Sequence, residues 1–183
     1  MTRVLIAGLG NMGLAHALAH HHHAEAEIVG LVNRSGVVDH ADLASYPVFA
    51  DFATALAETL PDLAVIATYT DTHVDYAIAA MEAGAHVFVE KPLAMTVADA
   101  RRVTDKAKET GRQLVVGYIL RHHPSWQRLI AEARALGGPF VFRLNLNQQS
   151  TGAEWETHKA LMQTTSPIVD CGVHYVDVMC QIT

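Results

Sequence analysis

Cysteine, basic clusters and long apolar runs are all scarce in this sequence. Its two cysteines, Cys171 and Cys180, have neither the number of a disulfide framework nor the paired spacing of a zinc site. The formal net charge is −6 without a block of lysine and arginine, which argues against nucleic acid or an anionic membrane as the main partner. No segment approaches the length of a membrane span, and the first residues lack a signal-peptide pattern. We therefore expect a reducing, cytoplasmic setting.

Hydrophobic residues, in contrast, make up 50% of the 183 residues, which is enough for a packed core. Short apolar, β-branched segments alternate with helical patterns over the first two thirds of the chain. Such continuously apolar strands are buried on both faces, so they predict a parallel, doubly wound sheet covered by helices. The expected strands are 3–9, 26–33, 62–68, 85–90 and 112–118, and the expected helices are 11–21, 71–84 and 96–111, with a weak strand and a helix within 46–58.

The pattern changes after residue 120. A helix is expected over 124–138, followed by alternating apolar and polar residues over 139–149, which is typical of a half-buried strand in an antiparallel sheet. No partner strand follows it in the sequence. We therefore expect a first domain at 1–120 and part of a second domain at 121–183, with the sequence stopping inside that domain.

The segment GLGNMG, which runs from Gly8 to Gly13, fits the G-x-G-x-x-G pattern of dinucleotide-binding loops. Gly8 permits a tight turn, Gly10 lets the backbone approach a pyrophosphate, and Gly13 allows close packing of helix and strand. The N–H groups at the helix start, which include Asn11 and Met12, can hold phosphates. A plain strand–helix turn is the alternative, but the position after a strand and before a helix favours a nucleotide site.

The end of the second expected strand bears on the choice of cofactor. An acidic residue there would bind the ribose 2′-hydroxyl of NAD, but this sequence has Asn33, Arg34 and Ser35. Arg34 can pair with a 2′-phosphate and stack on adenine. We therefore expect NADP(H) in preference to NAD(H). If Arg34 is only solvated, Asn33 would tolerate NAD equally well.

Glu90, Lys91 and Pro92 directly follow the fifth expected strand, at the carboxyl edge of the sheet, where ligands of doubly wound folds bind. A lysine in that position can stabilise a developing alkoxide or share an alcohol proton. A surface lysine paired with Glu90 is an equal alternative on position alone.

The last helical segment carries two stripes of side chains, because residues on a helix are about 100° apart. Asp170, His174 and Asp177 form a polar stripe that we expect to face the reacting groups. The neighbouring apolar stripe, which we expect to pack the helix down, consists of Val169, Val173, Val176 and Cys180.

Four segments together resemble the glucose–fructose oxidoreductase/inositol dehydrogenase (Gfo/Idh/MocA) family over almost the whole chain: GLGNMG, IATYTDTHVDYAIAAMEAGAHVFVEKPLA, VVGYILRHHP and DCGVHYVDVM. The resemblance implies a Rossmann domain followed by an α+β domain with an open, mostly antiparallel sheet. It also implies NAD(P)-dependent oxidation or reduction of a sugar, cyclitol or related polyol, with catalysis by Lys91, Asp170 and His174. A homo-oligomer formed through the second-domain sheet is expected if that domain is complete.

In the expected oxidation, His174 takes the hydroxyl proton, since the pKa of an imidazole is ordinarily near 6.5. Asp170 orients the substrate or His174, and Lys91 holds the oxygen. In the loop after the fourth strand, Thr68 and His73 are expected to touch the cofactor; there Tyr69 stands where the family often has proline.

Three further residues are candidates for the substrate site. Arg121 can bind a substrate hydroxyl or carboxylate, or tie the two domains together. Trp155 and His158 can line the pocket, although core packing is as reasonable for Trp155.

The histidine run from His20 to His23 is the one obvious cluster of metal-binding side chains. Ligands need directed geometry rather than adjacency, so we expect a surface helix end and no functional metal site. A metal-dependent hydrolase is accordingly a distant alternative. A non-catalytic nucleotide-binding or interaction module is the closer one, because a fold does not by itself imply turnover.

Overall fold

The computed structural model describes residues 1–145, 147, 151–152, 155–156, 159, 162 and 166–183. The chain divides into two compact units, Met1–Gly117 and Tyr118–Thr183, and each is described by itself. Within the described residues, no helix combines the length and the apolar character needed to cross a membrane.

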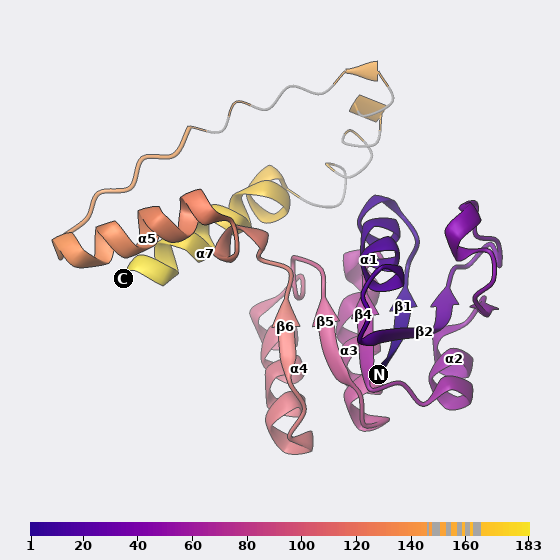
Figure 1. Ribbon diagram of the computed structural model, residues 1–183. Coiled ribbons are helices and arrows are strands. Elements are labelled where there is room, and N and C mark those ends of the chain that lie inside the picture. Colours follow the sequence, from indigo (N-terminus) through magenta and orange to yellow (C-terminus); the bar gives the residue numbers. More distant parts are fainter. Residues whose placement is uncertain (146, 148–150, 153–154, 157–158, 160–161, 163–165) are drawn as a thin grey trace. The chain divides into compact units, whose positions relative to one another are not determined.

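The first unit contains a six-stranded sheet in which every pairing is parallel (Figure 1). The order β3-β2-β1-β4-β5-β6 is that of a Rossmann fold, with the topological switch point between β1 and β4. This confirms the doubly wound parallel sheet predicted from the apolar strands. The strands are β1 (Thr2–Ala7), β2 (Ala26–Val32), β3 (Val48–Phe49), β4 (Leu63–Ile66), β5 (His86–Val89) and β6 (Leu114–Val116).

Two hydrophobic clusters cover the two faces of this sheet. Alternate residues of β1 enter different clusters, since successive strand side chains point to opposite faces: Val4 and Ile6 join one, and Leu5 and Ala7 join the other. Helix α1 (Asn11–His21) and the 3₁₀ turn η1 (Ala41–Leu43) contribute to the first cluster. Helices α2 (Phe52–Thr59), α3 (Thr70–Glu82) and α4 (Val97–Thr110) contribute to the second.

The helices of this unit lie where the sequence predicts them, with ends that differ by up to two residues from the expected ones. In α3, Val74 and Met81 are buried together with Ala77 and Ala80 on the face that packs against the sheet. Thr96 caps α4 by accepting a hydrogen bond of 3.1 Å from the Asp99 N–H, and Gly111 ends that helix in a left-handed conformation with φ of 65°. The two ends of α4 are therefore set by local capping interactions.

Among the described residues, the second unit contains the turn η2 (Ile119–Arg121), helix α5 (Pro124–Leu136), a π-helical turn η3 (Ile168–Gly172) and helix α7 (Val173–Ile182). Its buried cluster consists of Ile130, Val178 and Ile182, with Leu120, Trp126, Ala133, Phe140 and Phe142 packed against it. This is a small core compared with that of the first unit.

The strand expected over 139–149 is not formed by its described residues 139–145 and 147. A strand needs a neighbour for its backbone donors and acceptors, and none of these residues pairs with another described strand. The aromatic side chains of the segment are nevertheless used, because Phe140 and Phe142 lie against the cluster around Ile130. Val141, between them, is 98% exposed.

Candidate nucleotide-binding and catalytic site

The glycine loop joins β1 to α1 at the switch point of the sheet. Gly8 has φ of 88°, and a Cβ there would lie 2.5 Å from the Ala67 carbonyl oxygen. A Cβ on Gly13 would collide with the Gly8 backbone. At Gly10, by contrast, a Cβ would meet no atom within 4 Å. Gly8 and Gly13 therefore leave no room for a side chain. Gly10 lies in open space, next to the N–H groups at the start of α1.

A cleft of about 260 Å³ lies beside this loop and the end of β2. Asn33, one of its lining residues, donates from Nδ2 to Ser35 Oγ at 2.9 Å and to the Val37 carbonyl oxygen at 2.6 Å. His40 Nδ1 is buried and has no hydrogen-bond partner in the described part of the chain. The cleft is lined by Leu9, Leu14, Asn33, Ser35, Val37, Val38, Asp39 and His40.

Arg34 follows β2 and lies near the loop that follows β4. Its guanidinium carbon is 6.0 Å from the centre of the Tyr69 ring, at the limit of a cation–π contact. Tyr69 is 66% exposed and precedes the first residue of α3. The Arg34 guanidinium, after β2, and the Tyr69 ring, after β4, therefore lie close to each other near the switch point between β1 and β4.

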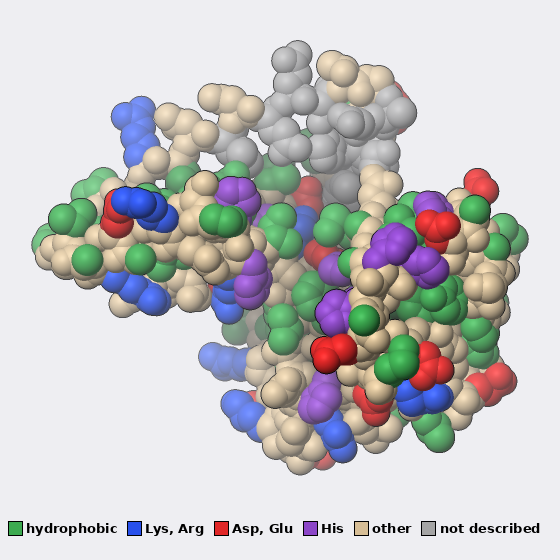
Figure 2. All heavy atoms as spheres, in the orientation of Figure 1, with side chains coloured by type: hydrophobic (Ala, Val, Ile, Leu, Met, Phe, Trp, Pro, Cys, Tyr) green, Lys and Arg blue, Asp and Glu red, His purple; other side chains and the backbone are tan. Residues whose placement is uncertain are grey.

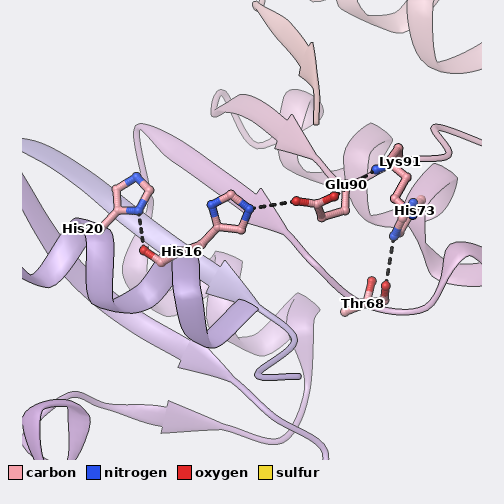
Figure 3. Close-up of polar contacts among 6 residues, drawn as sticks. All are labelled: His16, His20, Thr68, His73, Glu90 and Lys91. Carbon is pink, nitrogen blue, oxygen red and sulfur yellow. Dashed lines mark hydrogen bonds and ion pairs between the residues drawn. The ribbon is translucent and has the colours of Figure 1, made fainter. Parts of the chain in front are cut away.

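His73 connects the loop after β4 to the loop after β5. Figure 3 shows its contact with Thr68 in the first of these loops. The His73 side chain is 1% exposed, Nδ1 lies 2.8 Å from the Pro92 carbonyl oxygen, and Nε2 lies 3.0 Å from the Thr68 carbonyl oxygen. The Thr68 hydroxyl accepts a hydrogen bond of 2.6 Å from Thr72. His73 thus holds together two of the loops predicted to touch the cofactor, and its ring faces the protein backbone.

Glu90 lies at the end of β5 and is 6% exposed. Its Oε1 is 2.9 Å from His16 Nε2, and its Oε2 accepts a hydrogen bond of 3.3 Å from the Lys91 N–H. Figure 3 shows His16 and Glu90 pointing toward each other from α1 and from the end of β5. A Cβ on Gly117 would lie 2.9 Å from Glu90 Oε2, so this glycine leaves room for the carboxylate.

Burial by itself would raise the pKa of Glu90, because water no longer solvates the charged form. The hydrogen bond from His16, the charges of His16 and Lys91, and the Lys91 N–H act in the opposite direction and prevail, so the pKa lies below its ordinary value. A buried carboxylate is therefore kept ionised directly beside Lys91.

In the second unit, Arg121 and Asp177 form a bidentate ion pair. Arg121 Nε lies 2.8 Å from Asp177 Oδ2, and Asp177 is 8% exposed. The Arg121 guanidinium also lies over the Tyr118 ring, 5.2 Å from its centre. Burial and the charge of Asp177 raise the pKa of Tyr118. The pair joins η2 to α7, so the Asp177 carboxylate holds these two elements of the second unit together.

The expected polar and apolar stripes of the last helix are wrong in part. Asp177 lies on the buried face with Val178 and Ile182, whereas Val176 is 48% exposed and Cys180 is exposed. The π-helical turn η3 changes the phase of Asp170 relative to α7, and within α7 the ion pair with Arg121 holds Asp177 on the buried face. Asp170 precedes α7 and His174 lies in its first turn, with the His174 ring 6.3 Å from the Tyr118 ring.

Two of the substrate candidates lie in the segment between α5 and η3. Trp155 is 44% exposed and is not part of the buried cluster of the second unit. His158 lies outside the described residues.

Residues 2–118 match the sequence profile of the Gfo/Idh/MocA oxidoreductase family with an NAD-binding Rossmann fold. The chain belongs to the Gfo/Idh/MocA family. This confirms the family inferred from GLGNMG and from the motif of Glu90, Lys91 and Pro92.

Three proteins illustrate the likeness. The 4-carboxy-2-hydroxymuconate-6-semialdehyde dehydrogenase of Sphingobium sp. is 33% identical over an alignment of 168 residues, and the alignment covers 85% of this chain and 53% of that protein. Inositol 2-dehydrogenase of Salmonella typhimurium is 31% identical over an alignment of 121 residues, which covers 64% of this chain and 34% of that enzyme. The WlbA dehydrogenase of Bordetella pertussis, solved with NADH and UDP-GlcNAcA, has a TM-score of 0.66 at 28% identity, over 74% of this chain and 40% of that one. The chain thus spans about half the length of the first relative and about a third of the second.

Several residues of this Gfo/Idh/MocA site were not predicted from the sequence. His16 lies three residues beyond Gly13 on α1, and its partner Glu90 lies on another strand, so the pair follows only from the fold. Asp39 and His40 line the cleft from an irregular segment without a periodic pattern. The only feature of the sequence that could have indicated their role is the polar pair itself, Asp39 and His40, which follows shortly after the end of β2.

Proposed function

We propose that this chain provides the nucleotide site and the catalytic side chains of an NAD(P)-dependent oxidoreductase. Its proposed substrate is a sugar, a cyclitol or a related polyol, or the corresponding keto-sugar. The observation that carries this proposal is the meeting of the open glycine loop and the loop of Glu90, Lys91 and Pro92 at one edge of the sheet in the first unit. The unpartnered Nδ1 of His40 and the open space at Gly10 suit a polar ligand that lies along this edge.

When bound, the nicotinamide supplies a hydride acceptor for oxidation and a donor for reduction. In the proposed oxidation, His174 removes the substrate hydroxyl proton and Lys91 stabilises the negative charge that develops on the oxygen. Asp170 orients His174 or the substrate. Glu90 fixes the backbone of Lys91, and His73 fixes the carbonyl of Pro92, so both act by positioning the loop.

Two relatives bear on the substrate class, and only the inositol dehydrogenase is named for a polyol. One is named for an inositol and the other for a carboxylated semialdehyde. We favour the polyol class, and Arg121, Trp155 and His158 remain candidates for its binding. A homo-oligomer through the second unit is part of the same proposal.

For the cofactor we propose NADP(H) over NAD(H), because Arg34 is exposed at the end of β2 and can reach a 2′-phosphate. Asp39 opposes this preference, since it lines the cleft and would repel that phosphate. The Arg34→Ala variant should weaken NADPH binding by at least about tenfold and NADH binding much less, and Asp39→Asn should favour NADPH. Equal losses for both nucleotides in Arg34→Ala, measured by calorimetry, would contradict the assignment.

The experiment that tests the proposed activity is a turnover assay after a binding titration. Calorimetry of the chain with NADPH and NADH comes first, followed by nicotinamide absorbance with inositols, aldoses, keto-sugars and a carboxylated semialdehyde. The Lys91→Met and His174→Asn variants should retain nucleotide binding and lose about 10²–10⁴-fold in turnover.

A second candidate function is a nucleotide-binding module without turnover. The observation that favours it is that the open glycine loop and the cleft beside it are both formed by residues of the first unit, Met1–Gly117. Nucleotide binding without turnover on any substrate of the panel would support this candidate over the oxidoreductase. Absence of nucleotide binding would contradict both.

A further inference from the structure

We propose that His21, His22 and Asp42 form a binding site for a divalent transition-metal ion such as Zn²⁺, Co²⁺ or Ni²⁺. One ligand atom from each residue lies within 4.8 Å of the other two. Two imidazoles and a carboxylate are a ligand set that these ions accept, with a further position left to water. The adjacency of four histidines predicts no directed site, but Asp42 adds a ligand from another part of the chain.

The two segments that carry these ligands are packed firmly together. His21 is the last residue of α1 and His22 follows it, whereas Asp42 lies in η1. Leu43, the neighbour of Asp42, is 0% exposed and lies in the hydrophobic cluster to which Leu18 of α1 contributes. The Asp42 backbone is therefore fixed near the end of α1 by a buried side chain, independently of any metal.

The ring of His21 is oriented by the protein. Its Nδ1 lies 2.9 Å from the Tyr46 hydroxyl, which leaves Nε2 available to a metal. The rings of His21 and His22 are 4.8 Å apart in an edge-to-face arrangement. Ligand atoms around a tetrahedral zinc ion are roughly 3.4 Å apart, given bonds of about 2.1 Å. Rotation of the exposed side chains of His22 and Asp42 can close the remaining gap.

The other two histidines of the run have different surroundings. His20 Nδ1 lies 2.8 Å from the His16 carbonyl oxygen, and His23 Nδ1 accepts a hydrogen bond of 3.2 Å from the Glu25 N–H. Figure 2 shows histidine side chains grouped with acidic ones on the face of the first unit over α1. The proposed site uses only His21 and His22 of the four consecutive histidines. The neighbouring His23 and Glu25 therefore serve as matched controls.

The experiment uses the untagged chain, titrated with Co²⁺ by visible absorption and with Zn²⁺ by calorimetry. One ion per chain is expected, together with a higher melting temperature in the presence of Zn²⁺. The variants His22→Ala and Asp42→Asn should each lower the affinity by at least about tenfold, because each removes a ligand. The variants His23→Ala and Glu25→Gln should bind as the unsubstituted chain does.

The proposal is overturned if Asp42→Asn binds either ion with unchanged affinity, or if His23→Ala is as damaging as His22→Ala. Either result would mean that the histidine run binds metal by adjacency alone. Circular dichroism melting of each variant without metal separates lost ligation from lost folding. Because the readout is metal affinity, the outcome does not depend on nucleotide binding or turnover.

Discussion

At the scale of single residues, Glu90 connects the fold to the proposed chemistry. It is an ionised carboxylate, nearly removed from water, held by His16 of α1 and by the N–H of Lys91. A buried charge that loses its partner is costly, so His16 and Glu90 depend on each other. We expect His16→Ala to lower the free energy of unfolding by about 1–3 kcal/mol.

The lowered pKa of Glu90 gives this interaction a definite dependence on pH. A depressed carboxyl pKa stabilises the folded state above the unfolded value, near 4.5, and the stabilisation is lost as the pH falls through the folded pKa. The difference in unfolding free energy between the unsubstituted chain and Glu90→Gln should therefore be constant near neutral pH and shrink in acid. Urea titrations across this range measure it, and a difference that grows in acid would contradict the assignment.

The glycines of the loop should separate folding from binding. Gly10→Ala places a methyl group in open space with an ordinary backbone conformation, so the melting temperature should hardly change. The same methyl group would obstruct a pyrophosphate, and NADPH affinity should fall by at least about tenfold. Gly13→Ala, which collides with the Gly8 backbone, should instead lower the melting temperature. An unchanged nucleotide affinity in Gly10→Ala would be incompatible with the assigned phosphate site.

At the scale of elements, α7 shows how a long-range pair overrides a local pattern. Its buried face is set by Val178, Ile182 and the pairing of Asp177 with Arg121. The variant Asp177→Asn should destabilise the second unit by about 1–3 kcal/mol, because the buried carboxylate loses its charge and with it the ion pair to the partly exposed Arg121 guanidinium. Hydrogen exchange should speed up in α7 and η2 while β1 and β4 stay protected. Equal acceleration in both units would show that the pair has no local role.

The sequence predicts some elements much better than others, for physical reasons. Strands β1, β4 and β5 are continuous apolar runs bounded by glycine or by polar loops, so local pattern and fold agree. The glycine loop and the motif at Glu90 were found in the same way. Two predictions are wrong in the described residues. The strand over 139–149 needs a partner strand, which its own pattern cannot supply. The buried face of the last helix depends on the π-helical turn η3 and on the pairing of Asp177 with Arg121, which no local pattern reveals. The contact between His16 and Glu90 was missed because 74 positions separate them.

At the scale of the whole molecule, the chain combines a complete Rossmann sheet with a second unit that has a small core. The proposed reaction needs groups from both: Lys91 from the first unit, and Asp170 and His174 from the second. The proposed nucleotide site lies within the first unit, so we expect nucleotide binding to be the more robust property. Turnover requires the two units to place their groups around one substrate.

The most direct test of this account is a crystal structure of the chain with NADP(H) and a polyol bound. We predict the pyrophosphate at Gly10 and the substrate hydroxyl beside the nicotinamide, within hydrogen-bond reach, about 3 Å, of both Lys91 Nζ and a His174 ring nitrogen. A nucleotide seated elsewhere, or Lys91 and His174 on opposite sides of the bound ligand, would contradict the proposed mechanism.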